Sequence, residues 1–273
     1  MKIGLKTRFS DFNEIIKLKP DFVEFHFSDA DPDVKLPAKA KYNFPCMIHL
    51  PEFWHGNLID IAGIRNENQV LSLNESRDVL QKLITKSERL FEHFTNAENI
   101  FILHPGGMSF DKDYPENNKH RMEALIESLS LLKTNSSEIL VENLPPFPWY
   151  FAGQWNSNIF MDAKEIEKFC VSTGRKICFD TSHSKLYCNS AQKDFIEQFS
   201  IVKKFMKHIH IGDARGVDEE GIQIDEGEID FKKFFEAVQG YEGTIVNEIW
   251  MGYTNDFAGF KIANQKIKKY LAH

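Results

Sequence analysis

The sequence predicts an α/β protein of the (β/α)8 barrel class, the TIM-barrel architecture, and three observations support this prediction. Short apolar segments alternate with segments of helical periodicity from one end of the chain to the other. The apolar segments are hydrophobic throughout, which is typical of strands buried on both faces of a parallel sheet. Eight such segments are present, the number that closes this type of barrel. An open doubly wound sheet is the alternative.

The predicted strands and helices follow one another along the chain. The strands span residues 2–6, 22–26, 46–50, 100–104, 138–142, 176–180, 207–211 and 244–248. Apolar residues at three- and four-residue spacing predict the helices between them. These helices span residues 73–94, 121–132, 163–171, 194–205, 231–238 and 257–271. Gly174 and Gly240 stand where helix C-caps are expected.

The first predicted strand is followed by a segment that favours the barrel over the open sheet. Residues 6–10 read KTRFS and contain no glycine-rich phosphate loop, which argues against a dinucleotide-binding fold. No low-complexity tract or Pro/Gly/Ser-rich linker divides the 273 residues. We therefore expect one barrel domain over residues 1–273.

The composition is that of a globular protein, with 42% hydrophobic and 27% charged residues. The net charge of -7 argues against nucleic acid as a partner. We find neither a signal-peptide core nor an apolar run near the roughly 20 residues that cross a bilayer. The four cysteines lack the spacing of a zinc or redox motif. These features predict a cytoplasmic protein with no membrane partner and leave homo-oligomerisation open.

Residues of metal-ligand type close five of the predicted strands. His49, His104, Glu142, Asp180 and Glu248 each end an apolar run. Because the carboxyl ends of parallel strands meet at one rim of a barrel, these side chains should converge there. Nitrogen and oxygen ligands gathered at one rim predict a divalent-metal site and therefore a metalloenzyme.

Three carboxylates and one imidazole form the first candidate centre. Glu142, Asp180 and Glu248 are joined by His210, which lies just before the end of its strand. Hard oxygen ligands with one imidazole suit Mn²⁺, Mg²⁺ or Co²⁺, and Zn²⁺ is also compatible. His208 shares a strand face with His210 but lies deeper, so we interpret it as a packed residue of the barrel interior.

His49 and His104 have two interpretations that the residues themselves leave open. Either they bind a second, more zinc-like metal that Glu142 bridges, or they donate hydrogen bonds to substrate hydroxyls. The small-residue turn at 105–107 allows a close approach after His104. After Asp180, the sequence predicts a loop that brings His183 back towards it.

Aromatic residues follow several predicted strand ends and should crowd the mouth of the pocket. They are Phe53, Trp54, Phe147, Trp149, Tyr150 and Trp250. Sugar rings pack their C–H faces on such side chains, and a closed pocket protects a reactive enediolate from water. We predict that Trp54 and Trp250 bind the substrate.

Together these stretches resemble the xylose isomerase-like (β/α)8 barrel superfamily over essentially the whole chain. The matching residues are His49-Leu50-Pro51, His104-Pro105-Gly106, Glu142-Asn143, Asp180-Thr181-Ser182-His183, His210-Ile211-Gly212-Asp213 and Glu248. Residues 225–231 look like the glycine turn before the seventh helix of that superfamily. The motifs are specific for the superfamily and do not single out a subfamily.

The resemblance to ketose 3-epimerases implies a divalent-metal-dependent isomerase or epimerase acting on a sugar or sugar phosphate. Its implied metal ligands are Glu142, Asp180, His210 and Glu248. Glu142 and Glu248 would also be the catalytic acid/base pair that transfers a proton through an enediolate. His183 and Arg215 would hold substrate oxygens.

The resemblance to endonuclease IV implies the alternative, a zinc phosphodiesterase. The residues that match its ligand positions are His49, His104, Glu142, Asp180, His183, His210 and Glu248. Its additional Asp-x-His pair has no counterpart here, because residues 217–224 contain no histidine. This departure puts a third zinc site and that cleavage mechanism in doubt. A binding barrel without turnover is a third hypothesis, which the complete set of principal ligands argues against.

Overall fold

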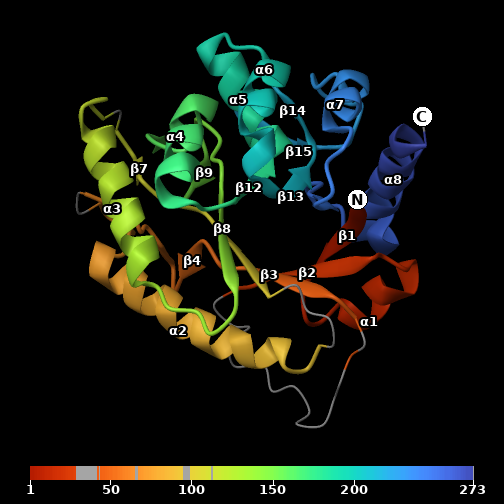
Figure 1. Cartoon of the computed structure of the whole chain (residues 1–273), viewed down its shortest axis with the longest axis horizontal. Helices are drawn as coiled ribbons and strands as arrows, with labels where there is room; N and C mark the ends of the chain where they lie inside the picture. Colours follow the sequence, from red (N-terminus) through yellow and green to blue (C-terminus); the bar gives the residue numbers. More distant parts are fainter. Residues whose placement is uncertain (29–41, 43, 65–66, 95–98, 112, 273) are drawn as a thin grey trace.

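The computed structural model describes residues 1–28, 42, 44–64, 67–94, 99–111 and 113–272. Eight parallel strands close into a barrel, and helices surround it (Figure 1). In chain order the barrel strands are β1 (Lys2–Thr7), β2 (Phe22–His26), β3 (Cys46–His49), β6 (Ile100–Leu103), β8 (Glu138–Glu142), β12 (Ile177–Asp180), β13 (Met206–Ile211) and β16 (Thr244–Asn247). Each strand pairs with its neighbour in this order, and β16 returns to pair with β1. The predicted (β/α)8 barrel is confirmed.

The helices alternate with the barrel strands. They are α1 (Phe12–Ile15), which continues as the 3-10 turn η1 (Ile16–Leu18), α2 (Leu73–Phe91), α3 (Asn117–Leu131), α4 (Ala163–Thr173), α5 (Thr181–Ala191), α6 (Phe195–Val202), which continues as η3 (Lys203–Phe205), α7 (Phe231–Val238) and α8 (Thr254–Leu271). Gly174 ends α4 with a φ of 71°, which confirms the predicted C-cap, whereas Gly240 lies one residue beyond the C-cap of α7. Among the described residues, no helix has both the length and the apolar character needed to cross a membrane.

Short antiparallel strands extend the loops that follow the barrel strands. They pair as β4 (Phe53–Trp54) with β5 (Asn57–Leu58), β7 (Met108–Ser109) with β11 (Asn156–Ser157), β9 (Trp149–Tyr150) with β10 (Gly153–Gln154), and β14 (Asp213–Arg215) with β15 (Glu219–Ile222). All of them follow carboxyl ends of barrel strands, so they build the rim at which the predicted ligands lie. Three barrel strands end one residue earlier than predicted, which leaves Leu50, His104 and Glu248 just beyond them.

The prediction of a loop after Asp180 is wrong, because helix α5 begins there. Asp180 is its N-cap, and the carboxylate oxygen Oδ1 accepts a hydrogen bond from the backbone N–H of His183 at 2.6 Å. The buried face of this helix is largely polar: Thr181 and Ser182 donate hydroxyl hydrogen bonds to the carbonyl groups of Gly212 and Asp213. A helix held by hydroxyl groups lacks the apolar periodicity by which the other helices were predicted.

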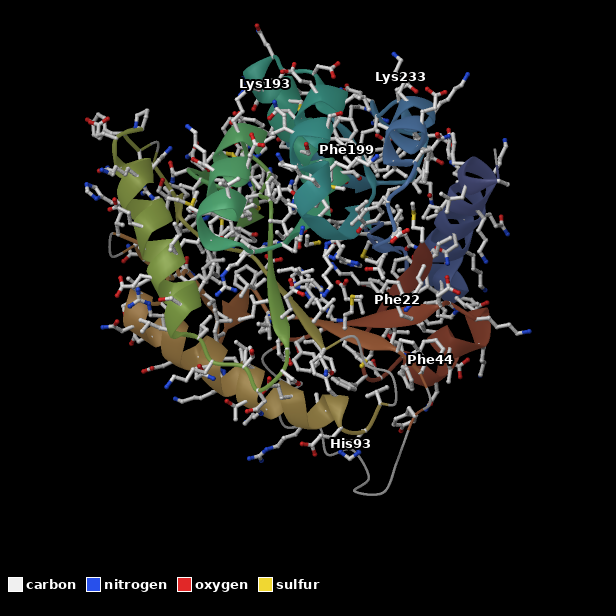
Figure 2. All side chains as sticks on the ribbon, viewed as in Figure 1. Phe22, Phe44, His93, Lys193, Phe199 and Lys233 are labelled. Atoms are coloured by element: carbon white, nitrogen blue, oxygen red, sulfur yellow. The ribbon has the colours of Figure 1, made fainter. Side chains whose placement is uncertain are left out.

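The strand side chains form two hydrophobic layers. Inward-facing residues fill the barrel: Phe22, Met47, Ile100, Ile102, Leu140, Cys178 and Val246. Residues that alternate with them pack against the helices, as Val23 and Ile48 do. Figure 2 shows Phe22 inside the molecule and Lys193 and Lys233 at its periphery. The interior of the barrel therefore contains an apolar layer, and most of its charged side chains lie towards the carboxyl ends of the strands.

Phe22 is the largest residue of the inner layer, and a glycine makes room for it. A Cβ atom on Gly4 of the neighbouring strand β1 would overlap the Phe22 ring, well inside contact distance. The ring is fully buried and lies edge-on to the imidazole of His208, with their centroids 5.9 Å apart. Phe22 therefore closes the barrel below its polar layer.

We predict that Phe22→Ala lowers the free energy of unfolding by about 3–5 kcal/mol, because it opens a cavity that the rigid barrel cannot refill. Urea-induced unfolding followed by circular dichroism measures this change. Tyr114→Ala is the control, because Tyr114 is 66% exposed and its loss should change stability by at most about 0.5 kcal/mol. Equal stability of the two variants would show that the barrel is not sealed by this ring.

Candidate functional site

A cavity of about 1420 Å³ opens at the carboxyl ends of the barrel strands. Side chains from several strand ends line it, among them Lys6, His26, His104, Asp180 and Glu248. The β14–β15 hairpin and the loop after β8 form its outer walls. This is the face on which barrel enzymes carry their active sites.

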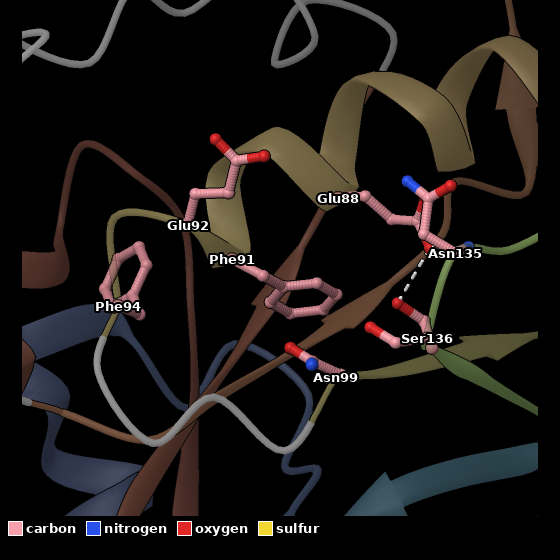
Figure 3. Close-up of a pocket in the computed structure, with 8 residues that line it drawn as sticks. Glu88, Phe91, Glu92, Phe94, Asn99, Asn135 and Ser136 are labelled. Atoms are coloured by element: carbon pink, nitrogen blue, oxygen red, sulfur yellow. Dashed lines mark hydrogen bonds between the residues drawn. The ribbon is translucent and has the colours of Figure 1, made fainter.

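A smaller cavity of about 340 Å³ lies at the opposite end of the barrel, between the C-terminal end of α2 and the segments that enter β6 and β8 (Figure 3). The carboxylate of Glu88 projects there and accepts hydrogen bonds from the backbone N–H of Asn135 at 2.7 Å and from the hydroxyl of Ser137 at 3.0 Å. None of the predicted site residues lines this cavity. Glu88 therefore has a local structural role that fastens α2 to the loop before β8.

The four residues of the first predicted centre come together at the rim. Glu142, Asp180, His210 and Glu248 each offer one ligand atom, and these atoms all lie within 4.8 Å of one another. Nδ1 of His210 lies 3.0 Å from Oε1 of Glu142 and 2.8 Å from Oε2 of Glu248. Glu142, Asp180 and His210 are at most 1% exposed, so their polar atoms point into a site largely screened from bulk water.

Asn143 fixes the position of Asp180 from the neighbouring strand. Its side-chain amide donates to the carbonyl of Asp180 at 3.0 Å and accepts from the N–H of Asp180 at 2.7 Å. With the helix cap described above, this leaves Asp180 little freedom of backbone or side chain. Precise placement of the carboxylate is therefore a property of three elements, β8, β12 and α5.

Three further imidazoles surround Glu142. Nε2 of His49 and Nε2 of His104 lie 3.1 Å and 3.4 Å from Oε2 of Glu142. Nδ1 of His183 lies 3.6 Å from the other oxygen, Oε1. The carboxylate of Glu142 is thus the shared centre of the first candidate set and of the two predicted histidines, His49 and His104.

The backbone decides which nitrogen of two of these imidazoles carries a proton. Nδ1 of His49 lies 2.9 Å from the carbonyl of Leu50, and Nδ1 of His183 lies 2.7 Å from the carbonyl of Asn143. A carbonyl oxygen only accepts hydrogen bonds, so each Nδ1 donates. The opposite nitrogens face carboxylates, Nε2 of His183 at 3.3 Å from Oε2 of Glu220. Such a contact requires a second proton on the ring or a cation that both groups bind.

His210 has the arrangement that metal-ligating histidines share. Its Nδ1 faces the donor set, and its Nε2 lies 3.1 Å from Oε2 of Glu24. A carboxylate on the far nitrogen fixes the tautomer and the orientation of a ligand imidazole. The same Glu24 oxygen lies 2.8 Å from Nε2 of His208, and Nδ1 of His208 lies 2.6 Å from the hydroxyl of Thr244. His208 is fully buried below the site, as the sequence predicts.

The sequence interpretation missed several residues of the site. They are Lys6, Glu24, Glu52, Asn143 as a positioning group, and Glu220. Lys6 and Glu24 lie inside the predicted strands 2–6 and 22–26, so alternation along each strand would have placed both side chains in the barrel. Glu52 lies in a loop and Glu220 in the short hairpin strand β15, which the sequence analysis did not predict.

Two predicted substrate-binding residues do not line the described cavity. The guanidinium of Arg215 is exposed, lies 3.2 Å from Oε2 of Glu219 and donates to the carbonyl of Glu226 at 2.6 Å. Trp54 packs against the hydrophobic core and against the ring of His55. His183 and the 70% exposed Trp250 do line the cavity. The other aromatic residues predicted at the mouth, Phe53, Phe147, Trp149 and Tyr150, also line it.

The close approach predicted at the 105–107 turn is made by a protein carboxylate. Gly107 donates its backbone N–H to Oδ1 of Asp60 at 2.7 Å. A Cβ atom on Gly106, which has a φ of 76°, would overlap that oxygen. Asp60 thus ties the loop after β3 to the loop after β6 and holds His104 at the rim.

Burial and charge act in opposite directions on the acidic groups. Burial favours the neutral form of Glu142, but His210 and His104 hold its pKa well below the usual range. Burial likewise opposes ionisation of Glu248, and Lys6 and His210 hold its pKa well below the usual range. Burial raises the pKa of Asp180 to about 6, because His183 compensates it only in part. The site is therefore short of positive charge around Asp180.

Three polar atoms at and just below the rim point to the same shortage. Among the described residues, no hydrogen bond reaches the buried atoms Oε2 of Glu248, Oε1 of Glu24 or Nδ1 of His104. Buried acceptors without a donor are costly, and a cation satisfies carboxylate oxygens and an unprotonated imidazole together. The donor set at the rim therefore fits a divalent cation.

Comparison with known proteins shows which family the chain matches. The sequence matches the family model for the xylose isomerase-like TIM barrel over residues 15–270. An uncharacterized protein of Methanocaldococcus jannaschii is 26% identical over 253 residues, which cover 86% of each chain.

Three solved structures of similar fold are 13–16% identical to this chain, a level at which the likeness concerns the fold. The IOLI protein with a binding zinc atom superposes with a TM-score of 0.71, covering 100% of this chain and 98% of its own. L-ribulose 3-epimerase gives 0.68, with 99% and 94% covered. Endonuclease IV from Thermus thermophilus gives 0.63, with 98% and 100% covered.

We predict that Asn143→Ala lowers the free energy of unfolding by about 1–3 kcal/mol, because it leaves the buried N–H and carbonyl of Asp180 without their hydrogen bonds to Asn143. Asn143→Asp should keep the hydrogen bond from the backbone N–H of Asp180, since a carboxylate still accepts it. The same substitution places another negative charge beside Asp180. Urea unfolding of both variants tests this. If Asn143→Ala were as stable as the wild type, Asn143 would not be the group that fixes Asp180.

Proposed function

Because the chain belongs to the xylose isomerase-like TIM barrel family, we propose that it is a divalent-metal-dependent isomerase or epimerase of a sugar or sugar phosphate. The observation that carries this proposal is the convergence of Glu142, Asp180, His210 and Glu248 within 4.8 Å at the rim. The fold shared with L-ribulose 3-epimerase supports the assignment to carbohydrate chemistry.

The proposed metal ligands are the same four residues, and Mn²⁺, Mg²⁺ or Co²⁺ suit their three carboxylates and one imidazole, with Zn²⁺ also compatible. When bound, such a cation supplies Lewis-acid polarisation of the substrate's carbonyl and neighbouring hydroxyl oxygens. Glu24 behind His210 and Asn143 behind Asp180 hold two of the ligands in place. The IOLI protein of similar fold has a zinc atom, which supports a metal in this chain as well.

Glu142 and Glu248 are the proposed acid/base pair. One carboxylate removes the proton from the carbon next to the carbonyl, and the C–H electron pair forms the double bond of an enediolate. The partner carboxyl group, when protonated, returns a proton to the opposite face of that carbon or to its neighbour. Lys6 and His210 favour the ionised form of Glu248, as a general base requires.

The cavity above this pair suits a sugar-like substrate. His183 lines it and offers an imidazole to substrate oxygens, while aromatic rings including Trp149 and Trp250 surround its mouth. Sugar C–H faces pack on such rings. Arg215 and Trp54, which do not line the described cavity, contribute to substrate binding in this proposal only if their loops rearrange.

A zinc phosphodiesterase like endonuclease IV is the second candidate, and the imidazoles around Glu142 favour it. His49 and His104 add nitrogen ligands beside Glu142, and His183 offers its Nε2 on the side of Glu220. The charge of the cavity argues against it. Among the described residues, the acidic side chains that line the cavity are Asp11, Glu52, Asp180, Asp218, Glu219, Glu220 and Glu248, whereas its lysine and arginine side chains are Lys6 and Arg8. A nucleic-acid backbone requires the opposite balance.

We predict one equivalent of manganese, magnesium or cobalt per chain in protein purified without a chelator or a histidine tag, and its loss in Glu142→Gln. Elemental analysis measures both. Glu88→Gln is the matched control, because it removes a carboxylate at the opposite end of the barrel and should retain the metal. Two or more equivalents of zinc would instead support the phosphodiesterase.

We predict that the metal-loaded protein exchanges a substrate C–H proton with deuterated solvent for at least one sugar of a broad panel. Glu248→Gln should slow this exchange by about 10²–10⁴-fold, the usual contribution of a general base. Proton NMR of the recovered sugars gives the measurement. Absence of exchange with every sugar, together with cleavage of an abasic-site duplex, would contradict the isomerase.

A further inference from the structure

Lys6 occupies a position between two carboxylates of the barrel that strand pairing imposes. Strand β1 lies between β16 and β2, and Lys6 is in register with Glu24 on β2. On the other side Leu5 is in register with Asn247, which places Glu248 beside Lys6. The ammonium group lies 3.7 Å from Oε1 of Glu24 and is hydrogen-bonded to Oε1 of Glu248.

These contacts close a ring of four ionisable groups at the floor of the cavity, which Lys6 and Glu248 line. Lys6 contacts Glu24 and Glu248, and each of these carboxylates contacts His210, at 3.1 Å and 2.8 Å. The side chain of Lys6 is 9% exposed, and that of Glu24 is fully buried. A buried ammonium group persists only with such partners, so the ring is a fixed part of the fold.

The two carboxylate oxygens of Glu248 have different partners in this ring. Lys6 holds Oε1, whereas Oε2 is buried, accepts no hydrogen bond from the described residues and is the oxygen that lies beside Nδ1 of His210. The side chain of Glu248 is 35% exposed and borders the cavity, so it has room to turn away. Lys6 is the group that keeps Oε2 directed towards the donor set.

We propose that Lys6 is a positioning residue: it holds Oε1 of Glu248 and keeps Oε2 directed towards the donor set, where it would serve as a metal ligand. This inference rests on the proposed function, since it concerns the same metal. Two effects of Lys6 oppose each other: its charge repels a divalent cation, and its hydrogen bond orients a ligand. Loss of a group that orients a ligand typically weakens metal affinity by about 10–100-fold. The orienting effect is the larger one in this proposal.

The test is the affinity of the apoprotein for Mn²⁺ and Zn²⁺, measured by competition with a chelator at fixed pH and ionic strength. Lys6→Met should bind about 10–100-fold more weakly than the wild type, with the same stoichiometry at saturation. Lys6→Arg, which keeps the charge and the donors, should recover most of the affinity. Arg8→Met is the matched control, because Arg8 is an exposed cation that lines the same cavity, and its loss should leave the affinity unchanged or raise it.

Each result decides the proposal. Equal or tighter binding by Lys6→Met would overturn it, because repulsion would then be the main effect of Lys6. Equal weakening in Lys6→Met and Lys6→Arg would overturn it too, because it would indicate general damage to the barrel. If Lys6→Met does not fold, Lys6→Gln gives the same readout with a polar side chain one bond shorter. A wild-type protein that binds neither metal would contradict the proposed function instead.

Discussion

Burial of like charges inside the barrel is the constraint on which the rest of this structure depends. Glu24, Glu142, Asp180 and Glu248 converge in a volume where Lys6 and a few imidazoles are the compensating groups. Carboxylates this close cannot all be ionised in a poor solvent without a compensating cation. Imidazolium groups and Lys6 supply part of that compensation, and the raised pKa of Asp180 shows where it falls short. This shortage of positive charge is why the donor set at the rim fits a divalent cation.

The barrel accommodates these buried carboxylates because an apolar layer lies beneath them along its axis. Phe22, seated over Gly4, completes an apolar layer beneath the charged ring, and the outer faces of the strands pack against helices. The pairing of neighbouring strands then brings the side chains at their carboxyl ends together at the rim. Positioning groups complete the arrangement: Asn143 and the α5 cap hold Asp180, Glu24 holds His210, and Asp60 holds the loop that carries His104.

The two candidate chemistries share most of their ligands, so residues outside the shared set distinguish them. In the β14–β15 hairpin, Glu220 faces His183, and the acidic lining around it disfavours a phosphate backbone. An isomerase needs two carboxyl groups that reach one carbon, and Glu142 and Glu248 both contact Nδ1 of His210. In both proposals the residues at the rim would hold the metal, and the loops above the rim would determine the substrate.

The sequence by itself determined the barrel class, the eight strands to within a residue or so, and the four residues that meet at the rim. It could do so because buried parallel strands are continuous apolar runs, and because their carboxyl ends share one edge. It did not reveal helix α5, whose buried face is largely polar, or the roles of Glu52 and Glu220, which depend on the paths of the segments that follow the barrel strands. Only the tertiary structure decided that Lys6 and Glu24 join the site, and that Arg215 and Trp54 turn away from the cavity. Those outcomes depend on strand register and loop packing, which contacts between distant residues determine and local patterns do not encode.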